Sequence, residues 1–287
     1  IVVGTGDGGP YAIGAQLLAR QWSRHIPGNP SIIVQAMPGG GGLKMGGWLQ
    51  QVAAKDGTFV GMPVQTVAMA QVLEPKDVPY DVRTWPWIGN MAVLRQAIVV
   101  ASTSPVRTVE DARKTEIVIG STAVGGNLFT VPKLARELAG FRLKIVLGYR
   151  GTSDIDKAMA GGEVQGRGGT WNDWKLLVPD WTKGDKIVPL VLTGTTRDPD
   201  AANVPLLRDL VADPIDKQVV DFFAQTDLIG RPFAAVPGTP PHVVEILRTS
   251  FAATMKDEAM IADTAKRNWP MEPTGWREVE KAVRDTL

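Results

Sequence analysis

Cysteine is missing from the 287 residues of this chain, and histidine occurs only as His25 and His242. Without thiols the chain forms no disulfide, no thiolate metal site and no cysteine nucleophile. Two histidines provide little material for imidazole-based catalysis or for a histidine-ligated metal. We therefore expect no catalytic residue, no metal and no cofactor.

Excess charge and long apolar runs are also missing. The 31 basic residues almost balance the 30 acidic ones, which argues against the concentrated basic surface of a nucleic-acid-binding protein. No run approaches the roughly 18 apolar residues that a membrane-spanning helix needs. Because Ile1 already belongs to an apolar strand pattern, we expect an N-terminus from which a signal peptide has been removed or trimmed.

Short apolar runs alternate with helical patterns along most of the chain, which predicts an α/β protein with mainly parallel sheets flanked by helices. The length exceeds that of one ordinary domain. Ser104-Pro105 follows a predicted strand and provides a crossing point between two domains. We predict one domain from residues 1–102 and 226–287, a second from residues 103–225, and a ligand cleft between them.

The individual elements follow from the same patterns. Beyond the first strand, we predict further strands at 31–36, 58–62, 98–101, 116–120, 144–147, 164–167 and 187–192. Helices are predicted at 43–53, 65–73, 128–139, 153–160 and 171–178, and the tail from Pro240 is predicted to be mostly helical.

A loop of small residues follows each of six predicted strands, at 4–10, 37–42, 62–66, 120–127, 148–153 and 168–171. Ligands of open parallel sheets bind beyond the carboxyl ends of the strands. Glycines give a ligand access to backbone N–H groups, and helix N-termini add partial positive charge. The loops therefore predict a carboxylate site. Five residues of these loops that we expect to contact the ligand are Gly41, Gln65, Thr66, Thr170 and Trp171.

The first loop, Gly4-Thr5-Gly6-Asp7-Gly8-Gly9, spells the GxGxxG fingerprint of dinucleotide-binding folds. Such folds need an acid about 20 residues further on to bind the ribose. The next acid after Asp7 is Asp56, so the loop favours a simple anion. An NAD(P)-dependent oxidoreductase nevertheless remains an alternative.

Several segments resemble a known family. They are the first loop with Tyr11 and QLLAR at 16–20, HIPGNPSIIVQAMPGGGG at 25–42, AAKDGTFVG at 53–61, GYRGTSDIDKAMAGGEVQG at 148–166, TRDPDAANVPLLRDL, and VPGTPPHVVEILRTSFAATMKDEAM. Over essentially its whole length the chain resembles the periplasmic solute-binding proteins of tripartite tricarboxylate transporters, also called Bug-type receptors.

The resemblance implies a two-domain periplasmic binding protein of the type II, flytrap kind. Such a monomer captures a small dicarboxylate, tricarboxylate or aromatic carboxylate in the periplasm and delivers it to the membrane permease of its transporter, with no nucleic acid as a partner. A two-component sensor is a possible further partner, and a ligand-sensing domain of a signalling protein is a second alternative.

The resemblance also implies which residues contact the ligand, through backbone amides, hydroxyls and water. They are Gly8, Gly9 and Tyr11 in the first loop; Ser121, Thr122, Gly125 and Asn127 in the loop that opens the second domain; and Tyr149, Thr152 and Asp154 further on. For Asp154 a structural role beside the helix N-terminus stays open, as does a packing role for both tyrosines. The chain departs from the family in having Asp7 and Ala12, and we expect those positions to influence ligand preference.

Overall fold

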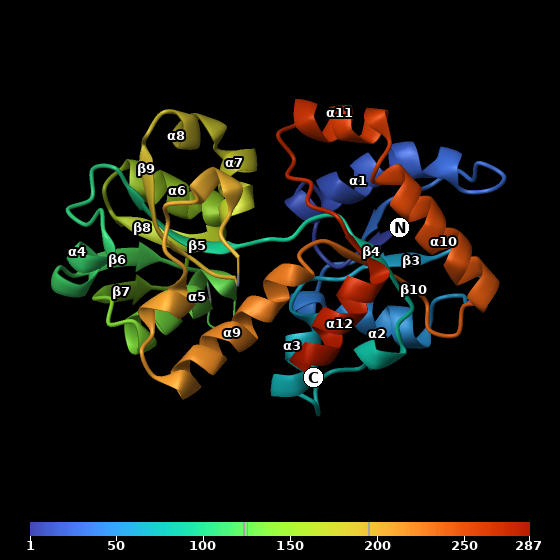
Figure 1. The fold of residues 1–287 in the computed structure, drawn as a ribbon, viewed down its shortest axis with the longest axis horizontal. Coiled ribbons are helices and arrows are strands. Elements are labelled where there is room, and N and C mark those ends of the chain that lie inside the picture. The colour runs from blue at the N-terminus through green and yellow to red at the C-terminus, as the bar shows by residue number, and fades with distance from the viewer. Residues whose placement is uncertain (123, 125, 195) are drawn as a thin grey trace. The chain divides into compact units, whose positions relative to one another are not determined.

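The computed structural model describes residues 1–122, 124, 126–194 and 196–287. The chain forms two compact units, one of residues Ile1–Leu94 and Gln225–Leu287, the other of residues Arg95–Ala224. Figure 1 shows the helices and strands of both units. Each unit is described by itself.

The first unit contains a six-stranded sheet with the order β11-β4-β10-β3-β1-β2. Its strands are β1 (Val2–Val3), β2 (Gln35–Ala36), β3 (Val60–Met62), β4 (Trp87–Asn90), β10 (Pro232–Ala235) and β11 (Thr274–Gly275). Strand β1 pairs in parallel with β2 and β3, whereas β10 pairs antiparallel with both β3 and β4. The carboxyl ends of β1, β2 and β3 therefore lie at one edge of the sheet.

Helices cover both faces of this sheet. The first-unit helices are α1 (Pro10–Trp22), α2 (Leu43–Gln51), α3 (Val67–Leu73), α10 (Pro241–Thr254), α11 (Glu258–Lys266) and α12 (Trp276–Thr286). Residues of α2, α3 and α12 share one apolar cluster with Ala234. The neighbouring Phe233 points to the opposite face, where its ring contacts Trp22 of α1 and Phe251 of α10.

The second unit contains a five-stranded sheet with the order β7-β6-β8-β5-β9. Its strands are β5 (Gln96–Ala101), β6 (Ile117–Gly120), β7 (Leu143–Val146), β8 (Gly166–Thr170) and β9 (Ile187–Leu192). Its helices are α4 (Val109–Lys114), α5 (Asn127–Leu138), α6 (Thr152–Ala160), α7 (Trp171–Leu177) and α8 (Pro179–Lys183). Helix α9 (Pro214–Leu228) then carries the chain from the second unit into the first.

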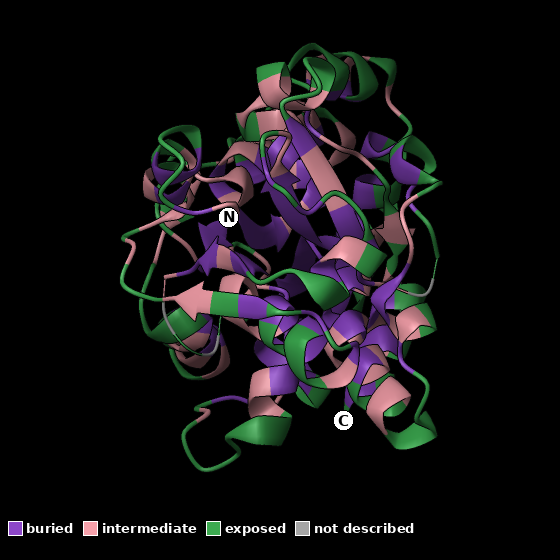
Figure 2. Cartoon of the chain, turned by 90° about the vertical axis from the view of Figure 1, so that its left-hand side faces the viewer, coloured by how far each residue is buried: buried purple, intermediate pink, exposed green. Residues whose placement is uncertain are grey.

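Strand β5 shows how the second sheet is buried on both faces. Ile98 and Val100 belong to an apolar cluster with residues of α4, α5 and α9, while Ala97 and Val99 belong to a cluster with residues of α6 and α7. This alternation is the two-residue period of a strand between two helix layers. Figure 2 shows the buried residues concentrated along the strands and the exposed ones on outer helix faces and loops.

The predicted α/β class is confirmed, with two sheets flanked by helices. Both sheets are mixed, however, because β10 and β5 run against their neighbours. Strand β5 pairs with β8 and β9, so residues 98–101 lie in the second unit and not in the first domain as expected. Of the predicted strand at 31–36, only Gln35–Ala36 is regular, and the short strands β4, β10 and β11 were not predicted.

We expect Gly89→Ala to destabilise the first unit. A Cβ at Gly89 of β4 would lie 2.4 Å from Cε1 of Phe251, which is buried and contacts two other aromatic rings. Such overpacking costs about 1–3 kcal/mol of unfolding free energy. Gly161→Ala is the control, because its Cβ would meet backbone oxygen atoms no closer than 3.5 Å. Chemical denaturation monitored by tryptophan fluorescence would measure both, and equal stability of the two variants would contradict this packing.

Candidate functional site

Three loops of the first unit meet at the carboxyl edge of its parallel strands. The N–H of Gly4 donates to the Met62 carbonyl at 3.1 Å, and the N–H of Met37 donates to Val3 at 2.8 Å. The Tyr11 hydroxyl accepts a hydrogen bond from the N–H of Gln65 at 2.9 Å. The loops after β1, β2 and β3 are therefore held together by bonds from one to the next.

The loop after β2 has a conformation that requires glycine. Gly39, Gly40, Gly41 and Gly42 have φ angles of 142°, 55°, 61° and 100°, a region that L side chains rarely adopt. A Cβ at Gly42 would also lie 2.6 Å from Val64 of the neighbouring loop. Gly41 is exposed, and a Cβ there would meet no atom within 4 Å. The backbone at Gly41 is thus exposed, and its contact with a ligand stays a prediction.

The N-terminus of α1 has the features of an anion site. Gly8 has a φ of 80°, Gly9 is the N-cap without a side-chain cap, and the first turn contains no acid. The first N–H groups of a helix lack intrahelical partners and carry partial positive charge. Of the two departures from the family, Asp7 is exposed and Ala12 is buried against the unit.

Two other helices lack this open character. Helix α4 begins with a capping box formed by Thr108 and Asp111, and the Asp257 carboxylate accepts from two N–H groups at the start of α11. By contrast α2 and α5, like α1, have glycine N-caps without side-chain caps and no acid in their first turns. All three follow loops at the carboxyl ends of parallel strands, but the first two N–H groups of α2 already donate to the Gly40 and Gly39 carbonyls. A bound anion would therefore complete the termini of α1 and α5.

Gln65 places a buried hydrogen-bond donor at the same edge. The residue is 6% exposed, and its Nε2 has no hydrogen-bond partner among the described residues. The same is true of the buried Oγ1 of Thr5, which follows β1. Buried polar groups normally have partners, so these two atoms call for an explanation such as a ligand. Thr66, also predicted, is the N-cap of the short helix α3 and is partly buried.

Arg231 is a residue at this edge that sequence reasoning missed. Its guanidinium carbon lies 4.1 Å from the centre of the Tyr11 ring, and the residue is 3% exposed. The backbone N–H of Arg231 donates to Oδ1 of Asn90 at 2.7 Å. Because β10 is antiparallel to β3, the start of β10 lies at the carboxyl edge. Arg231 precedes a strand, whereas the signal used in the sequence is a loop of small residues that follows a strand. The sequence pattern therefore does not indicate Arg231.

In the second unit the parallel strands β7, β6 and β8 likewise bring their carboxyl ends to one edge. The N–H of Ser121 donates to Val146 at 2.8 Å, and the N–H of Gly148 donates to Thr122 at 3.0 Å. Ser121 is fully buried, and its Oγ has no partner in the part of the chain that the structure describes. Predicted Gly125 lies outside the described residues, and Asn127 is the first residue of α5.

Two predicted contacts in the next loop have local partners for their side chains. The Tyr149 hydroxyl donates to Oε1 of Glu163 at 2.5 Å. Asp154 stands in the first turn of α6, and its Oδ2 accepts from Nε of Arg150 at 3.1 Å. These bonds favour the structural roles left open for both residues. Thr152 is the first residue of α6, after the N-cap Gly151.

The end of β8 carries the last predicted residues. Thr170 is partly buried. Trp171 is 7% exposed, and its backbone N–H donates to the Arg95 carbonyl at 2.8 Å. Arg167 of the same strand is paired with Asp156 at 2.6 Å and stacks over the Trp174 ring at 3.6 Å. This buried arginine therefore has a structural partner within its own unit, and it holds α6 and α7 on the sheet.

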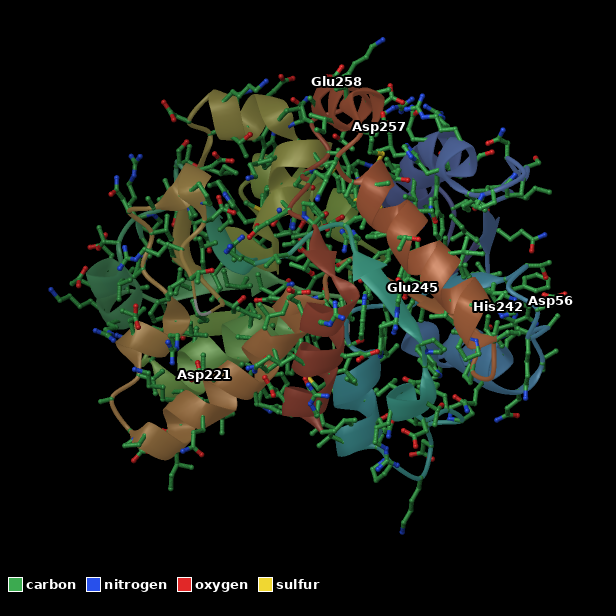
Figure 3. The ribbon with its side chains drawn as sticks, turned by 45° about the vertical axis from the view of Figure 1, so that its right-hand side comes forward. Asp56, Asp221, His242, Glu245, Asp257 and Glu258 are labelled. Atoms are coloured by element: carbon green, nitrogen blue, oxygen red, sulfur yellow. The ribbon has the colours of Figure 1, made fainter. Side chains whose placement is uncertain are left out.

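A cavity of about 610 Å³ lies elsewhere in the first unit. It is lined mainly by apolar residues of the segment 26–33, by residues 56–60 and by α10. Figure 3 shows Asp56 and His242 at one end of α10, and Val243 lies beside Gly57. This cavity does not suit a carboxylate, because its lining is mainly apolar and the ionisable side chain in it is the acid Asp56.

Neither histidine lies at the carboxyl edges. His25 Nε2 is 2.8 Å from Oδ2 of Asp257, the N-cap of α11, and His242 is in the first turn of α10. Within the described residues, no group of three or more histidine or acidic side chains is arranged to hold a metal. Nor does any helix of that part of the chain have the length and apolarity to cross a membrane.

We predict that Tyr149 titrates well above the ordinary tyrosine value of 10.0. The hydrogen bond to Glu163, together with desolvation, raises the pKa of Tyr149 to about 12. Because the folded state holds this proton more tightly, the stabilisation is complete below pH 10 and is lost as the pH rises from about 10 to 12. In ¹³Cζ-tyrosine NMR, Glu163→Ala should return the pKa toward 10.0, with Tyr149→Phe assigning the signal. If the assigned Tyr149 signal of the unmodified protein titrates near 10, the contact between Tyr149 and Glu163 is contradicted.

Comparison with known proteins places these two units in one family. Residues 18–275 match the family described as "Tripartite tricarboxylate transporter family receptor". The chain is similar to a TctC solute-binding protein from Polaromonas, with a TM-score of 0.73, 16% identity and coverage of 99% of this chain and 93% of that one.

Two further structures come from Rhodopseudomonas palustris. A protein solved with adipate gives a TM-score of 0.72 at 18% identity over 99% of this chain and 92% of that one. MatC with bound malate gives a TM-score of 0.69 at 17% identity, over 99% of this chain and 95% of that one. No curated protein sequence matches the chain. The family match covers most of the sequence, and the chain therefore belongs to the tripartite tricarboxylate transporter receptor family.

Proposed function

We propose that this chain is a receptor for a small carboxylate and catalyses no reaction. Its family consists of transporter receptors, and two similar structures are described with adipate and with malate, both dicarboxylates. A dicarboxylate, a tricarboxylate or an aromatic carboxylate fits the proposal. The receptor would act as a monomer in the periplasm and deliver its ligand to the permease of a tripartite transporter or, as a further role, to a two-component sensor.

One observation carries the proposal: the start of α1, which is open to an anion. A 13-residue helix begins there after a glycine loop, without a side-chain cap or a first-turn acid. A carboxylate at this point accepts hydrogen bonds from backbone N–H groups and interacts favourably with the helix dipole. Gln65 belongs to the adjoining loop, and its Nε2, which has no partner among the described residues, would be a second donor for the same group.

The proposed ligand contacts are assigned loop by loop. In the first unit they are Gly8, Gly9, Tyr11, Gly41, Gln65 and Thr66, to which we add Thr5. In the second unit they are Ser121, Thr122, Asn127, Thr152, Thr170 and Trp171, whereas Tyr149 and Asp154 would contribute through backbone groups, because their side chains bond to Glu163 and Arg150.

A dinucleotide oxidoreductase is the competing proposal, because the Gly4 to Gly9 loop does join a strand to a helix. The end of β2 argues against it. Ala36 and Met37 stand where a ribose-binding acid is needed, and β2 itself contains no acid. Titration of NADH followed by its fluorescence decides between the two, since saturable binding of NADH without carboxylate binding would overturn the receptor proposal.

We expect carboxylates to raise the melting temperature while their methyl esters do not. Esterification removes the negative charge that the helix N-termini favour, and a ligand stabilises only the state that binds it. Differential scanning fluorimetry across aliphatic, hydroxylated and aromatic carboxylates, each beside its methyl ester, would test this. Equal shifts by acid and ester, or no shift by any carboxylate, would contradict the proposal.

Gln65→Met tests the site itself. Methionine keeps the length of glutamine but has no donor, and loss of a hydrogen bond to a charged group corresponds to about 1.5–3 kcal/mol, or roughly 10- to 150-fold in affinity. Gln16→Met on the exposed face of α1 is the matched control and should bind as the unmodified protein does. Isothermal titration calorimetry measures both, and unchanged affinity in Gln65→Met would remove Gln65 from the site.

A further inference from the structure

The side chain of Tyr11 joins two loops at the carboxyl edge of the first sheet. Tyr11 is the second residue of α1, and its hydroxyl accepts a hydrogen bond at 2.9 Å from the backbone N–H of Gln65, 54 positions further along the chain. Gln65 also carries the buried Nε2 that has no partner among the described residues. The orientation of the Tyr11 ring therefore helps to determine where the start of α1 lies relative to this donor.

Arg231 packs on the face of the Tyr11 ring. Its guanidinium carbon lies 4.1 Å from the ring centre, within the limit of about 6 Å for a cation–π interaction. Arg231 is only 3% exposed, and such interactions are strongest where water is excluded. A planar guanidinium stacks on an aromatic face, which the compact ammonium group of lysine does not do. The contact thus restrains the ring in a way that depends on arginine.

Arg231 is itself fixed by the neighbouring strand β4. Its backbone N–H donates to Oδ1 of Asn90 at 2.7 Å, and its carbonyl accepts from the N–H of Met91 at 3.0 Å. Asn90 is completely buried. In the side chain, Nη1 of Arg231 donates to the Gly230 carbonyl at 3.0 Å. Tyr11 therefore packs against a group that both backbone and side-chain bonds hold in place.

We propose that Arg231 is a positioning residue of the carboxylate site and acts through Tyr11. The proposal rests on the proposed receptor function. The guanidinium holds the ring in the orientation in which the hydroxyl reaches the Gln65 N–H, so that the uncapped start of α1 and Nε2 of Gln65 are arranged around one carboxylate before it binds. Without the stack the ring has other staggered orientations, which carry the hydroxyl away from Gln65. Binding then has to supply the ordering of both loops and becomes weaker.

The positive charge of Arg231 could favour an anion by itself, and lysine separates the two effects. Arg231→Lys keeps the charge but loses the planar stack. Arg248→Lys is the matched control, because the Arg248 guanidinium stacks on the Trp276 ring at 3.6 Å in the same unit. Arg248 bonds to the carbonyl of Trp87 at the start of β4. Since β4 and β3 both run antiparallel to β10, that residue lies at the opposite edge of the sheet.

Isothermal titration calorimetry measures the effect on binding. The probe is malate or adipate, whichever binds more tightly, and otherwise the carboxylate of the fluorimetry screen with the largest shift. We expect Arg231→Lys and Tyr11→Phe each to weaken binding about tenfold, and Arg248→Lys to leave it unchanged. Because both changes break one connection, the double variant should bind about as well as either single variant. Unchanged affinity in Arg231→Lys, or losses that multiply in the double variant, would overturn the proposal.

The amide signal of Gln65 tests the connection without any ligand. In ¹H–¹⁵N spectra, Tyr11→Phe removes the acceptor of this N–H and should move its proton upfield, and Arg231→Lys should move it in the same direction. A Gln65 signal that stays in place in Arg231→Lys overturns the proposal. If the signal moves as expected but no carboxylate binds the unmodified protein, the receptor function fails instead.

Arg231→Met, which removes the cation and keeps an unbranched side chain, serves if Arg231→Lys does not fold. It should weaken binding and move the Gln65 signal at least as much as the lysine variant. If neither variant folds, Arg231 serves the fold of the whole unit, and a specific role in positioning Tyr11 is overturned.

Discussion

Parallel pairing of three strands in each sheet determines where the candidate ligand residues lie. With β2, β1 and β3 parallel, the loops that follow them emerge at one edge, and β7, β6 and β8 do the same in the second unit. Reversal of β1 would move the start of α1 to the opposite edge and separate Tyr11 from Gln65. The short bonds between loops, such as that from Gln65 to Tyr11, depend on this arrangement.

The electrostatic character of these edges comes from backbone more than from charged side chains. Helices α1, α2 and α5 begin with glycine and without acids, whereas α4 and α11 are closed by their own carboxylates. The buried arginine of β8 is already paired, with Asp156. An anion held by N–H groups and neutral side chains needs no arginine partner of its own, and under the proposal neutral groups such as the Gln65 amide would contribute to its selectivity.

Much of this arrangement can be predicted from the sequence. A strand followed by a glycine-rich loop is a pattern of neighbouring residues, so it can be read without knowing which strands pair. The loops of 4–10 and 37–42, and the helices that follow them, lie where the pattern indicates. Arg231 could not be found in this way, since its place depends on an antiparallel strand far along the chain. Nor could the bond from Tyr149 to Glu163, because these two residues stand before and after α6 and are 14 positions apart.

A carboxylate that binds at the loops beyond the parallel strands would change the surroundings of the backbone amides in those loops. Backbone amide ¹H–¹⁵N shift mapping with a binding carboxylate reports on every loop at once. We expect the largest shifts at residues 5–12, 39–43 and 64–67 in the first unit and at 121–122, 148–152 and 170–172 in the second. Shifts confined to the apolar cavity lined by residues 26–33, residues 56–60 and α10 would contradict binding at these loops.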